Sequence, residues 1–90
     1  MQKTVHIIVT GKVQGVFYRQ HTREKAQELG VTGHVKNMHD GTVHITATGD
    51  TEKIKRLIDW CKDGPPRADV TNVFFEEKNL QEFDRFSISR

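Results

Sequence analysis

The start of the chain alternates between apolar and polar positions. In the stretch TVHIIVT, residues 4–10, Val5, Ile7 and Val9 fall on one face of an extended chain. The other face carries His6, Ile8 and Thr10. A period of two is typical of a strand that is buried on one side, so we expect the first strand here.

Helical periodicity appears twice further along. Residues 19–29 are mostly polar, and Gly30 is a typical stop after the last turn. Their narrow apolar stripe comprises Tyr18, Thr22, Ala26 and Leu29. A second helix is expected between Asp50, a favourable N-cap, and the breaking stretch that starts at Gly64 and continues with two prolines. Its buried stripe comprises Ile54, Leu57, Ile58 and Cys61.

A β-hairpin is predicted between the two helices. Its strands are residues 32–37 and 42–48, and the turn HDG joins them. Gly41 would take the left-handed position of a three-residue turn. The register that follows pairs Met38 with Thr42 and places Asn37 opposite Val43.

Two further strands complete the pattern, at residues 70–77 and 86–88. The element order is β-α-β-β-α-β with a short tail strand. Right-handed crossovers then place both helices on one face of an antiparallel sheet and leave the opposite face open to water. We therefore expect a ferredoxin-like α+β sandwich, formed by residues 1–90 as one domain.

Composition narrows the class of protein. With 90 residues and 34% hydrophobic content, the chain can build only a thin core. It contains no apolar run near the roughly 20 residues that span a bilayer, and no signal-peptide segment. The net charge of +2 is interleaved and does not imply nucleic acid, and the single cysteine, Cys61, cannot form an internal disulfide. We expect a soluble cytoplasmic protein without a membrane or nucleic-acid partner.

Candidate chemistry lies in the loop GKVQGVFYRQ, residues 11–20. Gly11 and Gly15 permit positive φ, so successive N–H groups can converge as a nest at the start of a helix. Arg19 at that helix start opposes the helix dipole, and a bound anion would relieve the conflict. The residues alone leave two interpretations open: an anion cradle, or a structural glycine turn with a surface arginine.

Two stretches resemble the signatures of the acylphosphatase family. GKVQGVFYR is similar to the pattern Gly-x-Val-Gln-Gly-Val-x-Phe-Arg, with Tyr18 in place of the usual Phe. GHVKNMHDGTVHI is similar to the family's Gly-x-Val-x-Asn stretch followed by Asp-Gly-Thr-Val, with His34 where Trp is frequent. The resemblance covers nearly the whole chain.

The resemblance implies a monomeric enzyme that hydrolyses acyl phosphates to a carboxylate and inorganic phosphate without a metal or cofactor. The phosphoryl group would be held by the Arg19 guanidinium and by the cradle, residues 15–19. The cradle consists of Gly15, Val16, Phe17, Tyr18 and Arg19. Asn37 would orient the attacking water, and Thr42 is a candidate to fix the Asn37 rotamer through a diagonal contact. Because the leaving group is a carboxylate, no strong general acid is needed.

For several histidines and for Phe17, the sequence leaves both a functional and a purely structural role open. On the open face, His6, His34 and His44 could form a metal cluster or be ordinary solvated histidines, and the neighbouring Lys36 disfavours a cation. His21, near the cradle, could tune substrate access or simply face solvent. Phe17 could shield the phosphate or the acyl group, or have no such role.

Alternative functions belong to other classes. The ferredoxin-like fold also carries RNA-recognition domains, but an RNP-like aromatic motif is missing from the strands of this open face. Acylphosphatase-like domains also occur inside larger carbamoyl-transferring maturation proteins, and a silent relative could bind phosphate alone. The presence of both Arg19 and Asn37 argues against the silent relative. A chain with nothing attached favours the free-standing enzyme, which we expect.

Overall fold

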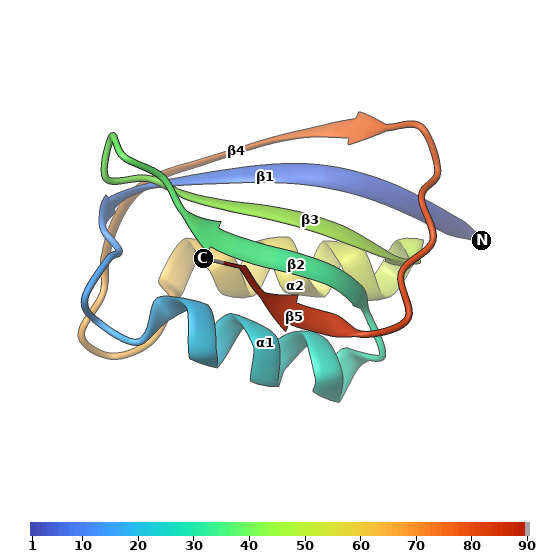
Figure 1. The fold of residues 1–90 in the computed structure, drawn as a ribbon, viewed down its shortest axis with the longest axis horizontal. Helices are drawn as coiled ribbons and strands as arrows, with labels where there is room; N and C mark the ends of the chain where they lie inside the picture. Colours follow the sequence, from blue (N-terminus) through green and yellow to red (C-terminus); the bar gives the residue numbers. More distant parts are fainter. Residues whose placement is uncertain (90) are drawn as a thin grey trace.

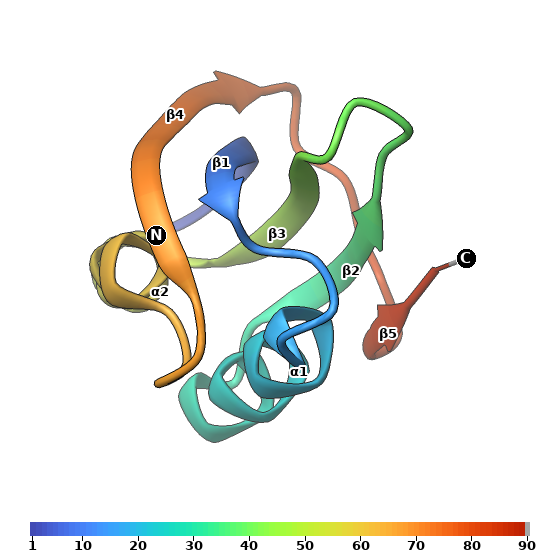
Figure 2. The same cartoon turned by 90° about the vertical axis from the view of Figure 1, so that its left-hand side faces the viewer.

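The computed structural model describes residues 1–89, which form one sheet with both helices on the same face (Figures 1 and 2). The helices are α1 (Tyr18–Leu29) and α2 (Thr51–Asp63). The strands are β1 (Gln2–Lys12), β2 (Thr32–Asn37), β3 (Val43–Asp50), β4 (Asp69–Lys78) and β5 (Phe86–Ile88). Neither helix of this described part is long and apolar enough to cross a membrane.

The strand order is β4-β1-β3-β2-β5, which confirms the ferredoxin-like α+β sandwich. The four longer strands are antiparallel, as expected. The short β5 differs, because it runs parallel to β2 with Gly33 opposite Phe86. After β4 the chain crosses to the other edge of the sheet before β5 begins (Figure 1), so the sheet is mixed rather than wholly antiparallel.

The predicted apolar faces form the core. The inward residues of β1, Val5, Ile7 and Val9, are almost completely buried. Both helical stripes are buried as well, except that Leu29 is only partly covered. The Asp50 side chain accepts from the Glu52 N–H, so the predicted N-cap of α2 is formed.

Strand β1 continues beyond the predicted residues and delivers the chain to the loop. Its pairing with β4 shifts register between Thr10 and Gly11. Gly11 has φ 121°, and a Cβ there would lie 2.2 Å from the Asp69 carbonyl oxygen. Only glycine fits this close approach, and it keeps the end of β1 paired with β4 up to Lys12.

The face opposite the helices is less open than expected. Residues 79–85 cross it at one end (Figure 2). There the Gln81 N–H donates to Thr4 Oγ1 at 2.9 Å, and Thr4 Oγ1 lies 2.6 Å from Thr48 Oγ1. Both threonines are buried. The alternation of β1 could not reveal this cover, because a segment distant in sequence provides it.

Candidate active site

The loop between β1 and α1 is anchored by two buried valines. Val13 and Val16 enter the core, whereas Phe17 between this anchor and the helix is 60% exposed. Gly15 and Phe17 both adopt left-handed backbone conformations, with φ 73° and 64°. For the non-glycine Phe17 this costs roughly 1–2 kcal/mol. Such strain is typical of functional loops that the surrounding structure holds in place.

The backbone of this loop presents unpaired donors. Phe17 is the N-cap of α1 and provides no side-chain cap, and the first turn contains no acidic residue. The first bond of the helix runs from the His21 N–H to the Phe17 carbonyl. Within residues 1–89, no backbone N–H from residue 15 to residue 20 donates to a protein acceptor. The loop and the positive end of the helix dipole are therefore suited to bind an anion.

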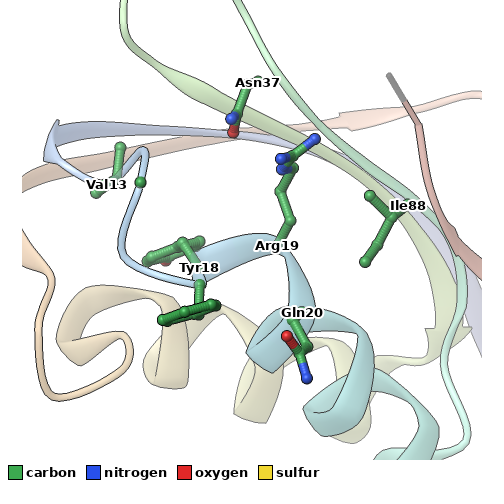
Figure 3. A pocket seen from close by; sticks show the side chains of 8 residues that line it. Val13, Tyr18, Arg19, Gln20, Asn37 and Ile88 are labelled. Atoms are coloured by element: carbon green, nitrogen blue, oxygen red, sulfur yellow. The ribbon is translucent and has the colours of Figure 1, made fainter.

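A cavity of about 320 Å³ lies over these donors. The lining residues are Val13, Gly15, Phe17, Tyr18, Arg19, Gln20, Asn37 and Ile88. Figure 3 shows the Arg19 guanidinium, from α1, and the Asn37 amide, from β2, pointing toward the same space. The structure thus brings together the two residues that the sequence singled out as catalytic.

Asn37 has an unusual environment for a partly buried amide. Its Oδ1 is buried and, among the residues that the structure describes, has no hydrogen-bond partner. A buried acceptor without a donor costs free energy, so such groups are often found where a ligand or water binds. This acceptor is suited to a water molecule between Asn37 and a bound anion.

The role expected for Thr42 is not seen. The predicted hairpin register is confirmed, with the Met38 N–H donating to the Thr42 carbonyl and Asn37 opposite Val43. The Thr42 hydroxyl, however, donates to Asp40 Oδ1 at 2.6 Å, and the Thr42 N–H donates to the same oxygen. These bonds lower the pKa of Asp40. The one hydroxyl proton is used within the turn, and among residues 1–89 no hydrogen bond joins Thr42 to Asn37.

A residue that the sequence interpretation missed connects the loop to the hairpin. Gln14 Nε2 donates to the Met38 carbonyl at 2.8 Å and to the Thr42 carbonyl at 2.9 Å. The sequence gives only a weak indication of this role, because Gln14 is simply a long amide side chain in a loop and belongs to no apolar face. Ile88, in the last strand, is a further cavity residue that the sequence does not indicate, because its pattern predicts only a strand there.

Tyr18 contributes its backbone to the cradle and its side chain to the core. Its hydroxyl donates to the Cys61 carbonyl at 2.7 Å, and its ring packs against Trp60 with centroids 5.5 Å apart. Burial raises the pKa of the Tyr18 hydroxyl, and it raises the pKa of the Cys61 thiol to about 12. Neither group is a nucleophile for this cavity, and Tyr18 acts as an anchor.

The histidines of the open face do not assemble into one cluster. His6 Nε2 lies 3.1 Å from His44 Nδ1, whereas the ring of His34 packs edge-on against Phe83. Burial and the nearby His44 lower the pKa of His6, and burial and Lys36 lower that of His34. Across residues 1–89 no group of three or more His, Cys, Asp or Glu side chains is arranged to hold a metal ion.

His21 lies away from the cavity. It borders a separate surface hollow with Glu24, Lys25, Glu28 and Trp60, between the two helices. Access to the cradle is therefore bordered by Phe17, Gln20 and Ile88, rather than by His21.

The fold and the site define a ferredoxin-like domain in which a loop of unpaired N–H donors faces a polar amide. The acylphosphatase family model matches residues 5–88, and the chain belongs to that family. The family predicted from the two signatures is thereby confirmed. Membership makes the chain a hydrolase of acyl phosphates, and a module that only binds phosphate or RNA is not favoured.

Known relatives agree along the whole chain. An acylphosphatase of Methylococcus capsulatus is 46% identical over 89 residues, which are 98% of this chain and 97% of the relative. The solved structure of an acylphosphatase from Coxiella burnetii superposes with a TM-score of 0.95 at 42% identity, covering 98% of this chain and 93% of that one. A similar fold occurs in HypF of T. kodakarensis, with a TM-score of 0.80 and 37% identity, where the match is only 12% of that chain.

Proposed function

We propose that acyl phosphates are hydrolysed in the cavity between α1 and β2. The observation that carries this proposal is the unpartnered Oδ1 of Asn37, which faces Arg19 above a row of unpaired N–H groups. The N–H groups of residues 15–19 and the Arg19 fork match the oxygens of a phosphoryl group. Asn37 Oδ1 accepts a hydrogen bond from the attacking water.

The reaction balances with these groups alone. Water oxygen bonds to phosphorus, and the phosphorus–oxygen bond to the acyl group breaks with its electron pair leaving on the carboxylate. Among the described residues that line the cavity there is no carboxylate or imidazole, so the water proton passes to a phosphoryl oxygen. Phosphoryl transfer depends chiefly on positioning and charge stabilisation. We therefore propose that no metal or cofactor takes part.

The reaction is tested by measuring phosphate release from benzoyl phosphate with and without a chelator. We expect equal turnover in both, since Arg19 and the backbone supply the positive charge. Loss of activity with the chelator that returns on adding a divalent cation would overturn the metal-free proposal. Absence of phosphate release in every condition would overturn the hydrolase itself.

We propose that the acyl group of the substrate lies against the apolar border of the cavity. Arg19 and the cradle hold the phosphoryl end, which leaves Phe17 and Ile88 to contact the acyl end. Phe17 is 60% exposed and packs little against the core, which supports its role as a contact for the acyl group. Two apolar side chains discriminate weakly, so the enzyme accepts a broad range of acyl groups.

Truncating this border should change substrate preference. Ile88→Ala is expected to lower kcat/KM for benzoyl phosphate about 5-fold more than for acetyl phosphate, because roughly 1 kcal/mol of apolar contact is lost only with the larger acyl group. The ratio of the two kcat/KM values is the measurement. Val73→Ala, at a partly buried position of β4, is the matched control. An equal loss on both substrates would show that Ile88 does not contact the acyl group.

For the cellular setting of the enzyme, we propose what the sequence led us to expect. We propose one domain over residues 1–90 that acts as a cytoplasmic monomer on small molecules, without nucleic acid or membrane. The free thiol of Cys61 is consistent with a reducing compartment. Sedimentation of the purified protein at several concentrations tests the monomer.

A further inference from the structure

Gln14 provides the side-chain connection between the two halves of the site. The cradle and Arg19 belong to the loop and α1, whereas Asn37 belongs to β2. One nitrogen, Gln14 Nε2, donates to two carbonyl oxygens on the hairpin, 24 and 28 residues away. Among residues 1–89, no other side chain of the loop at 13–17 is hydrogen-bonded to the hairpin.

The two carbonyl oxygens that accept from Gln14 belong to the hydrogen-bonded turn of the hairpin. Met38 directly follows Asn37, and the Thr42 carbonyl already accepts the Met38 N–H at 2.9 Å. The Met38 carbonyl accepts the Gly41 N–H at 3.2 Å. An amide nitrogen carries two donors, and both are used here. Gln14 therefore binds the closed end of the hairpin at two points, next to the residue that orients the water.

We propose that Gln14 is a positioning residue that fixes the distance between the phosphate-binding loop and Asn37. This inference rests on the proposed function, because it requires a phosphoryl group on the cradle and a water on Asn37. The loop itself is anchored separately, by the buried Val13 and Val16. Loss of the Gln14 bonds thus leaves phosphate binding intact and lets the hairpin shift relative to it.

The expected signature is a selective loss of turnover. Gln14→Met keeps the length of the side chain and removes both donors. We expect kcat for benzoyl phosphate to fall about 10- to 100-fold, since a misplacement near 1 Å can cost that much. The inhibition constant of inorganic phosphate should stay within about 2-fold, because the donors that bind phosphate are unchanged. Gln27→Met, an exposed position of α1, is the matched control and should change neither value.

A double-mutant cycle with Asn37→Ala distinguishes positioning from a general effect on the fold. If Gln14 acts through the water on Asn37, Gln14→Met should cost little further activity once Asn37 is removed. A full additional loss in that background, or weaker phosphate inhibition by Gln14→Met alone, would overturn the inference. If Gln14→Met does not fold, Gln14→Asn, which is too short to reach both carbonyls, carries the same expectations.

The cycle also separates this inference from the function on which it rests. If Asn37→Ala turned over substrate at the wild-type rate, the water-orienting role of Asn37 would be ruled out, and the positioning role of Gln14 would be ruled out with it. A reduced but measurable kcat of Asn37→Ala, combined with additive effects of the two substitutions, would rule out only the role of Gln14.

Discussion

Arg19→Ala is expected to lower kcat/KM for an acyl phosphate by about 10³-fold or more and to abolish inhibition by inorganic phosphate. Loss of one preorganised neutral donor typically costs about 10²–10³ in rate, and a charged fork that contacts two phosphoryl oxygens contributes more. Steady-state kinetics with benzoyl phosphate and calorimetric titration with phosphate give the two measurements. Arg19→Lys should restore only part of the rate, since a point charge cannot bind two oxygens at once.

The same substitution should leave stability almost unchanged. Arg19 is half-buried at the start of α1, where its charge opposes the helix dipole. Its removal is therefore expected to shift the free energy of unfolding by no more than about 0.5 kcal/mol. Added phosphate should raise the melting temperature of the wild type and not that of Arg19→Ala.

The control for Arg19 lies one turn along the same helix. Arg23→Ala removes an equal charge from α1 and is expected to keep both turnover and the phosphate-induced stabilisation. Undiminished turnover by Arg19→Ala would contradict the assignment of the charge-stabilising role. Equal losses in both variants would point to the net charge of the helix rather than to a contact with the phosphoryl group.

The parts of the fold that depend on local patterns could be predicted from the sequence. The alternation of β1, both helical stripes and the three-residue turn lie within short stretches, so their periods and turn residues specify them. The hairpin register follows from turn length, which is why the position of Asn37 opposite Val43 was predictable. The prediction that Arg19 and Asn37 belong to one site came instead from the resemblance of two separate stretches to the family's signatures.

The features that escaped prediction depend on contacts between distant segments. Residues 79–85 have no strong hydrophobic pattern of their own. They nevertheless cross the sheet at Thr4, which accepts a hydrogen bond from Gln81 and is buried. The hydroxyl of Thr42 donates to Asp40 within the same turn rather than to the Asn37 side chain. Gln14 reaches the hairpin 24 residues away, a contact that no local rule could indicate.

Several features that lower the stability of the fold occur together in the site. Phe17 has a left-handed backbone, the helix start has no cap, and Asn37 has a buried acceptor without a partner. Each of these would be corrected in a sequence selected for stability alone. Under the proposed function, a phosphoryl group and its attacking water would satisfy the last two together, which would account for their occurrence in one cavity.

The unpartnered acceptor leads to the second large effect. Asn37→Ala is expected to lower kcat about 10²- to 10³-fold, because the attacking water loses the group that orients it. The inhibition constant of phosphate should stay close to the wild-type value, since the cradle and Arg19 remain. Steady-state kinetics with phosphate as inhibitor measure both quantities, and Asn72→Ala, at an exposed position of β4, is the control.

Stability supplies an independent check on the same residue. A buried acceptor without a donor costs about 1–3 kcal/mol, so Asn37→Ala should be as stable as the wild type or more stable. Asn37→Asp would add a negative charge beside the phosphoryl site, and it should weaken phosphate binding as well as turnover. If Asn37→Ala unfolded more easily and lost phosphate affinity together with activity, Asn37 would be supporting the cavity instead of orienting the water.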